Sequence, residues 1–147
     1  TEIQQAEEFE TVISHLKEPK TTRGGLNPER LQEIIGNIIF LMENEKVYQE
    51  TELTLNQLAS KLQVPSYQVS QTLNEGMKKN FYDLVNGYRV EEAKRLLLDP
   101  RNNNYTILSV GFEAGFNSKT TFNTVFKKFT GLTPTEFREK RKEPLLV

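Results

Sequence analysis

Residues 106–131 read TILSVGFEAGFNSKTTFNTVFKKFTG, and this stretch decides the fold. Apolar residues recur every three or four positions on either side of Gly115-Phe116-Asn117, a spacing that predicts helices over 106–115 and 118–130. Two short helices joined by a tight turn are typical of a helix-turn-helix unit, in which a small residue lies where the helices cross. Gly111 supplies that small residue, and Phe116 is the expected buried plug of the turn.

A second copy of this pattern lies upstream. In the first helix of each copy the apolar positions match at an offset of 52, which pairs Leu55, Leu58, Ala59 and Leu62 with Ile107, Val110, Gly111 and Ala114. After one extra residue in the second turn the offset is 53, which pairs Val69, Leu73 and Leu84 with Phe122, Phe126 and Phe137. The upstream turn is Gln63-Val64-Pro65, with Val64 as its plug. The repeat predicts helix-turn-helix units over about 53–76 and 106–130, joined by a long helix over 81–98.

The remaining segments also have helical patterns. Asn27-Pro28-Glu29 is a strong helix start, and apolar residues at helical spacing continue to about Glu45. Pro134 to Lys142 predicts a last helix. Residues 1–25 combine an acidic amphipathic helix with a linker, which sets them apart from a domain over 26–147. No stretch alternates like a strand, so the predicted fold class is all-α, with one or two extra helices before the repeat.

The composition argues against an enzyme. The 147 residues include no Cys and a single His, His15, so thiolate chemistry and histidine-based metal sites are not expected. The acidic residues Glu91, Glu92 and Asp99, like those near Glu8, have no partner His or phosphate loop and are expected to be solvated. We expect no cofactor and no metal. Apolar stretches are too short to cross a bilayer, so the chain as given is expected to be soluble, cytoplasmic and without membrane contact of its own.

Charge is distributed unevenly along the chain. The whole sequence has a net charge of −1, but residues 1–50 hold 5 Lys+Arg against 10 Asp+Glu, whereas residues 51–147 hold 14 against 10. Within the second part, residues 118–142 hold 7 basic side chains and 2 acidic ones. A basic end of this kind either binds phosphate or is an ordinary solvated face.

The second helix of each unit buries one face and leaves a polar face for a groove. Gln and Asn pair with adenine, and Ser, Thr and Tyr contact bases, thymine methyls or phosphates. Neither helix contains Arg, the usual guanine reader, so readout weighted toward A·T pairs is expected. The predicted DNA-contacting residues are Ser66, Tyr67, Gln68, Ser70, Gln71 and Asn74 in the first copy, and Ser118, Lys119, Thr120, Thr121, Asn123, Thr124, Lys127 and Lys128 in the second.

The sequence resembles the AraC/XylS transcriptional regulators between roughly Leu53 and Arg141. The second unit fits the signature of that family at Gly115-Phe116, Ser118, Phe122, Phe126-Lys127-Lys128, Gly131, Thr133-Pro134 and Phe137-Arg138, and the linker helix fits it at Phe81, Tyr88-Arg89, Ala93 and Leu96-Leu97. The resemblance implies a DNA-binding domain with two helix-turn-helix units and a long linker helix.

The first unit departs from this pattern. Gln63 stands at a turn position where the family often has Gly, and Lys78 stands where the second copy has Gly131, with Gly76 as an alternative helix stop. The segment before the signature resembles a subgroup with an N-terminal membrane sensor, which would make residues 1–25 a cytoplasmic connector. A soluble sensor domain is the rival interpretation.

These features predict the double-stranded DNA-binding output domain of a bacterial transcription regulator, with no catalytic activity. The recognition helices 66–76 and 118–130 would enter successive major grooves, and helix N-termini at Ser66 and at Ser118 or Lys119 would offer amides to phosphates. The alternative is a helical protein-interaction module that contacts RNA polymerase or self-associates through residues 1–45, with only incidental DNA contact.

Overall fold

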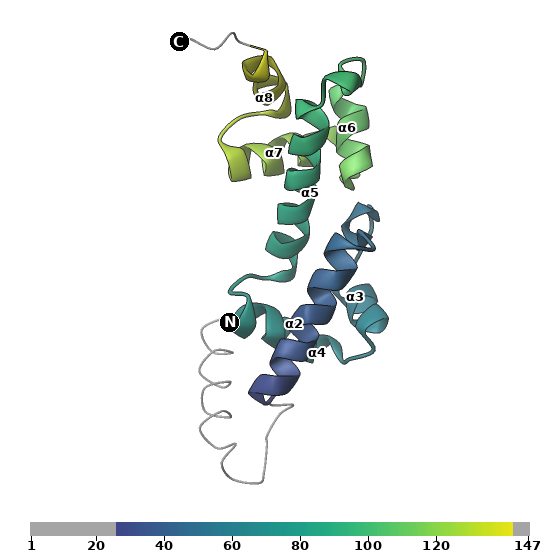
Figure 1. The fold of residues 1–147 in the computed structure, drawn as a ribbon, viewed down its shortest axis with the longest axis vertical. Helices are drawn as coiled ribbons and strands as arrows, with labels where there is room; N and C mark the ends of the chain where they lie inside the picture. The colour runs from purple at the N-terminus through teal and green to yellow at the C-terminus, as the bar shows by residue number, and fades with distance from the viewer. Residues whose placement is uncertain (1–25, 143–147) are drawn as a thin grey trace. The chain divides into compact units, whose positions relative to one another are not determined.

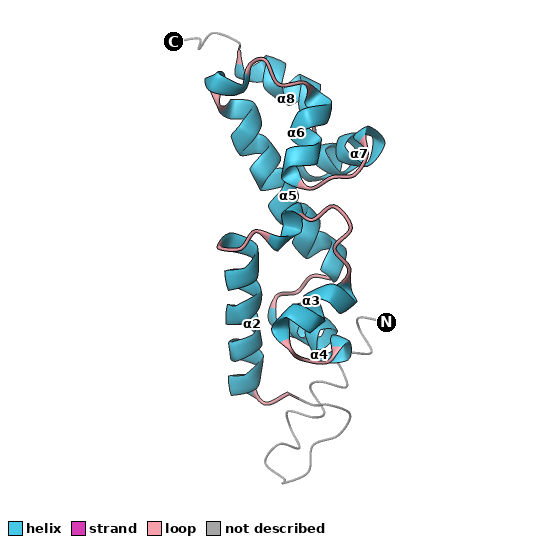
Figure 2. Ribbon diagram, turned by 90° about the vertical axis from the view of Figure 1, so that its right-hand side faces the viewer, coloured by secondary structure: helices cyan, strands magenta, loops and turns pink. Residues whose placement is uncertain are grey.

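The computed structural model describes residues 26–142, and all regular structure within them is helical (Figures 1 and 2). The predicted all-α class is therefore confirmed for this part of the chain. The helix and linker predicted over 1–25 lie outside the described residues. The elements are α2 (Pro28–Glu43), the 3₁₀ turn η1 (Val47–Gln49), α3 (Leu55–Leu62), α4 (Ser66–Gln71), the π-helical turn η2 (Thr72–Gly76), α5 (Phe81–Leu98), the 3₁₀ turn η3 (Pro100–Asn102), α6 (Ile107–Ala114), α7 (Lys119–Thr130) and α8 (Pro134–Arg141).

Capping side chains fix where the helices begin. The Asn27 side chain accepts a hydrogen bond from the Arg30 amide at 2.7 Å, as its position before Pro28 predicts. Thr54 and Thr133 each form a capping box with the residue three positions later, and Thr106 caps α6. Such a cap satisfies an amide that has no partner within the helix and stabilises it by about 1 kcal/mol.

The chain forms two compact units. Residues 26–46 and 53–84 make the first unit, and residues 47–52 and 85–142 make the second. The boundary between the units falls within α5, between Leu84 and Val85. The short segment 47–52 was not predicted to belong to the second helix-turn-helix, because in sequence it lies ahead of the first.

The first unit packs α2 against α3 and η2, and α3 against α4. Ile34, Ile38 and Met42 of α2 are buried, with Leu58 of α3 and Val69 of α4. Fully burying a side chain of this size stabilises the fold by about 1.5–3 kcal/mol. Val64, the predicted plug of the first turn, is only half-buried.

The core of the second unit is built largely from aromatic rings. Phe116 stacks on Phe122 with ring centroids 5.0 Å apart, and Phe126 meets Phe122 and Phe137 edge to face at 5.7 and 5.4 Å. Phe116 is 1% exposed, which confirms it as the plug of the turn. Val90, Ala93 and Leu97 of α5 and Val110 and Ala114 of α6 complete this core.

The two copies share their turn geometry at matching positions. Gln63 and Gly115, which end α3 and α6, both have left-handed backbones, with φ of 61° and 111°. Lys78 and Gly131, which follow the second helices, also have left-handed backbones, with φ of 58° and 85°. A left-handed conformation costs a residue with a Cβ roughly 1–2 kcal/mol, so the first copy is locally strained at two turns where the second uses glycine.

Gly76 stands at a helix end, as predicted for an alternative stop. It is the last residue of η2, but the chain reverses at Lys78, and the Lys79 amide donates to Leu73 O at 3.1 Å. A Cβ added at Gly76 would lie 2.6 Å from Ile35 Cδ1 of α2. A side chain at Gly76 would therefore require the end of the Ile35 side chain to shift. The predicted helix 66–76 is also not uniform, since it winds into a π-turn at Thr72.

We expect Gly111→Leu to destabilise the second unit by about 1–3 kcal/mol, because even a Cβ at this position would lie 2.6 Å from the Phe122 ring. The control is Gly36→Ala in α2, where an added Cβ has nothing within 4 Å and should stabilise the helix by about 0.5–1 kcal/mol. Thermal melting of the full chain measures both. A melting temperature of the Gly111→Leu variant equal to that of the parent would contradict the close crossing of α6 and α7.

Candidate nucleic-acid interface

The second helix-turn-helix presents a broad polar face on α7. Ser118 caps the helix by accepting a hydrogen bond from the Thr121 amide at 3.1 Å, while Phe122 and Phe126 bury the opposite side. Among the predicted contact residues of this copy, Ser118 and Asn123 are half-buried, and the exposed ones are Lys119, Thr120, Thr121, Thr124, Lys127 and Lys128. The amides of Lys119 and Thr120 have no acceptor within the helix, so they are oriented outward at its positive end.

Fewer of the predicted DNA-contacting side chains are exposed in the first helix-turn-helix than in the second. Among the predicted contact residues of the first copy only Tyr67 is exposed, with a relative exposure of 53%. The half-buried ones are Ser66, Gln68, Ser70, Gln71 and Asn74. The Ser66 hydroxyl donates to Asn56 Oδ1 of α3 at 2.6 Å, and Pro65 stands at the cap position without a side-chain hydrogen bond. The two copies therefore differ in how their polar side chains are engaged.

Gln71 was predicted to read adenine through both atoms of its amide. Its Oε1 atom is buried, and within the described part of the chain no group donates to it. A buried acceptor without a donor costs about 1–3 kcal/mol. A bidentate contact with adenine would therefore require the Gln71 side chain to turn outward.

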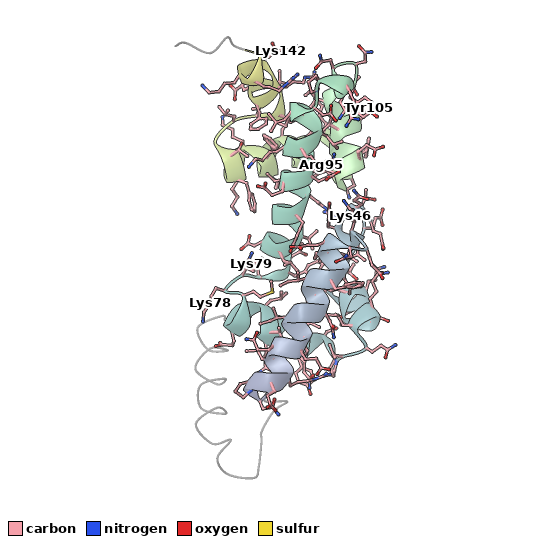
Figure 3. All side chains as sticks on the ribbon, in the orientation of Figure 1. Lys46, Lys78, Lys79, Arg95, Tyr105 and Lys142 are labelled. Atoms are coloured by element: carbon pink, nitrogen blue, oxygen red, sulfur yellow. The ribbon has the colours of Figure 1, made fainter. Side chains whose placement is uncertain are left out.

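Among the seven basic residues of 118–142, the three lysines of α7 and the two arginines of α8 differ in their surroundings. Lys119, Lys127 and Lys128 are exposed on α7. Arg138 and Arg141 of α8 instead hold the loop before α6, donating to Tyr105 O at 2.6 Å and to Asn103 Oδ1 at 2.8 Å. Figure 3 labels Tyr105 near the α6 end of this loop and Lys142 at the end of α8. The charge count from sequence thus overstated the cations that are exposed for phosphates, because it could not identify those with structural partners.

The acidic residues Glu91, Glu92 and Asp99, for which we expected no catalytic or metal-binding role, form ion pairs with basic neighbours. Glu91 pairs with Lys94 at 3.0 Å and Glu92 with Arg95 at 2.7 Å. The Arg101 side chain, assisted by its amide, lowers the pKa of Asp99 to about 2. The expectation of a solvated face is wrong for Glu92, which is 8% exposed and held by both Nε and Nη2 of Arg95.

No group of three or more His, Cys, Asp or Glu side chains within residues 26–142 could hold a metal ion. No helix in the same range has the length and apolar character needed to span a bilayer.

The chain matches a helix-turn-helix domain family over residues 58–140. It is 30% identical over 90 residues to an HTH-type transcriptional regulator of Staphylococcus aureus (strain COL), a match that covers 61% of this chain and 12% of that protein. Among solved structures, it resembles the C-terminal domain of the two-component response regulator yesN from Fusobacterium nucleatum, with 33% identity and a TM-score of 0.58, covering 73% of this chain and 96% of that one.

A solved transcriptional regulator with an AraC-type DNA-binding domain, from Chromobacterium violaceum, has the same fold at 22% identity and a TM-score of 0.64, covering 78% of this chain and 96% of that one. The family match extends over more than half of the chain and includes both turns and α7. The chain therefore belongs to the AraC-type helix-turn-helix family, the DNA-binding domains of transcription regulators.

Proposed function

We propose that this chain binds double-stranded DNA sequence-specifically, as the output domain of a transcription regulator. The helix-turn-helix units would lie within a domain over 26–147, at about 53–76 and 106–130, with 81–98 as linker. The observation that carries the proposal is α7, a capped helix with one face fixed by Phe122 and Phe126 and the other exposed and polar. This construction suits a helix that enters a major groove.

Base reading and phosphate binding fall to different side chains of α7. Asn123 and Thr124 have the amide, hydroxyl and methyl groups that distinguish base edges. Lys127 and Lys128 follow in the last turn as exposed cations, and the amides at the N-terminus are suited to a phosphate. Specificity would then come from the middle of the helix and affinity from its ends.

In the first unit, the proposed reading helix is 66–76. Tyr67 is the most exposed of its predicted contacts and can pack on thymine methyls. Gln68, Ser70 and Asn74 would supply further polar contacts. Because five of the six predicted contacts in the first copy are half-buried, against two of eight in the second, we expect this helix to contribute fewer base contacts than α7.

A protein-interaction role is the second candidate. Leu108 and Phe112, one turn apart on α6, are 42% and 48% exposed, and the nearby Tyr105 is 42% exposed. Exposed apolar side chains of this kind suit a protein partner, such as RNA polymerase or a second copy of this chain. Leu108→Ser with Phe112→Ser should leave DNA binding unchanged while reducing transcription or self-association. Retention of both transcription and self-association would remove this candidate.

DNA binding by this chain should depend on salt concentration. A duplex selected by the full chain from a random pool should bind less tightly as salt rises, with a log-log slope of about −0.9 for each phosphate neutralised. Filter binding at a series of salt concentrations measures the slope. A flat response, or the absence of any selected duplex, would show that DNA is not the ligand.

The side chains of α7 should differ in their effects on base preference and on affinity. Asn123→Ala should relax preference at particular base pairs by about 1–3 kcal/mol, whereas Lys127→Ala or Lys128→Ala should weaken all sequences alike and reduce the salt slope by about 1. Lys94→Ala is the matched control, because this lysine of α5 is paired with Glu91. Binding to a panel of single-base variants measures all four. An unchanged preference profile for Asn123→Ala would remove this residue from base reading.

Two reading helices in one chain should give two clusters of contacted base pairs. If 66–76 and 118–130 enter successive major grooves, one chain should be sensitive to base changes in two clusters about 10 base pairs apart. Asn123→Ala should affect one cluster, and Tyr67→Ala, at the most exposed predicted contact of the first unit, should affect the other. Base-by-base substitution of a selected site tests this arrangement. A single contiguous cluster would mean that only one helix reads bases.

A further inference from the structure

The segment 47–52 is a packed part of the second unit, although it precedes the first helix-turn-helix in sequence. Val47 and Tyr48 are 4% and 5% exposed. The Tyr48 ring stacks on Tyr88 of α5, with centroids 5.7 Å apart and planes inclined by 20°. We refer to residues 47–52 as the strap.

Arg89 of α5 holds the strap through backbone oxygens. Its Nε donates to Tyr48 O at 2.7 Å and its Nη2 to Glu50 O at 2.8 Å. The same guanidinium lies over the Phe116 ring, with Cζ 5.9 Å from the centroid. Burial lowers the pKa of Arg89, but an arginine still carries its charge. A planar fork can satisfy two carbonyls at once, which a lysine ammonium on a flexible stem does not reproduce.

Gly115 shows how closely the strap approaches the turn of the second helix-turn-helix. A Cβ at this position would collide with Tyr48 O and would lie 2.8 Å from Arg89 Nε. Its φ of +111° is also left-handed. Gly131 has the same backbone requirement, with φ of +85°, but a Cβ there would have nothing within 4 Å. Alanine at Gly131 would therefore strain the backbone alone, whereas alanine at Gly115 would strain the backbone and also displace the strap.

We propose that Arg89 is a positioning residue for base reading by α7, and that the strap is a working part of the second helix-turn-helix. Arg89 joins the strap to Phe116, and Phe116 stacks on Phe122 of α7. The strap and α5 thereby fix the turn from which α7 begins. This inference rests on the proposed function, since it concerns the DNA contacts of α7.

The first test compares Arg89→Lys and Arg89→Gln with the parent, as full chains, on a duplex selected by the parent. Discrimination at the base pairs that Asn123→Ala identifies should fall about ten-fold in both variants, while discrimination at the other cluster stays unchanged. A uniform loss at both clusters would indicate general destabilisation and overturn the proposal. Full recovery by Arg89→Lys would also overturn it, because a single ammonium would then suffice.

The second test uses the glycine pair. Gly115→Ala should reproduce the altered profile of the Arg89 variants, whereas Gly131→Ala should lower thermal stability without changing the base profile. The double variant Arg89→Gln with Gly115→Ala should be no worse than the more affected single variant, since both changes break the same contact. Identical profiles for the two glycine variants, or strictly additive losses, would contradict a role for the strap.

A readout without DNA separates failure of this inference from failure of the proposed function. Amide hydrogen exchange in the full-length Arg89→Gln variant should increase over 47–52 and 115–118, with no change over 58–73. If the parent selects no duplex but this local pattern appears, the proposed function fails while the structural link stands. Unchanged exchange over both segments would show that Arg89 does not hold the strap.

Discussion

Where α6 crosses α7, the backbone of Gly111 lies so close to the Phe122 ring that no side chain fits between them. This contact sets the separation of the two helices, and the rings around it depend on that separation. Phe122 stacks on Phe116 on one side and meets Phe126 on the other. Because one face of α7 is fixed in this way, the opposite face can remain exposed and polar without cost to the core.

Much of the helical architecture could be predicted from sequence because its signals are local. Capping residues such as Asn27, Thr106 and Ser118 stand at the observed helix starts, and the apolar spacing of the repeat indicates α3 and α6 at matching positions. A cap requires a hydrogen bond to an amide three residues away, so sequence alone contains the information. The family resemblance rested on positions of the second unit and of the linker helix, and it is confirmed by the match over 58–140.

Other features could not be predicted, because they depend on partners distant in sequence. Arg89 donates to carbonyls 39 and 41 residues away, and a backbone carbonyl has no sequence signature. Arg138 counted as a cation for DNA, yet it binds Tyr105 O, 33 residues away. The inward orientation of Gln71 Oε1 likewise depends on how the helix packs rather than on its apolar spacing. The contact residues of both helices therefore remain predictions.

The two helix-turn-helix units differ in backbone strain and in the regularity of their second helices. In the first copy Gln63 and Lys78 have left-handed backbones, and the second helix ends in a π-turn. The second copy uses Gly115 and Gly131 at the same positions, and α7 is regular over 12 residues. A regular helix set in an aromatic core holds its side chains in defined positions, which base discrimination requires. The first copy is built with more strain and fewer exposed polar groups, so its contribution to binding would lie more in the fit of a whole surface than in individual base contacts.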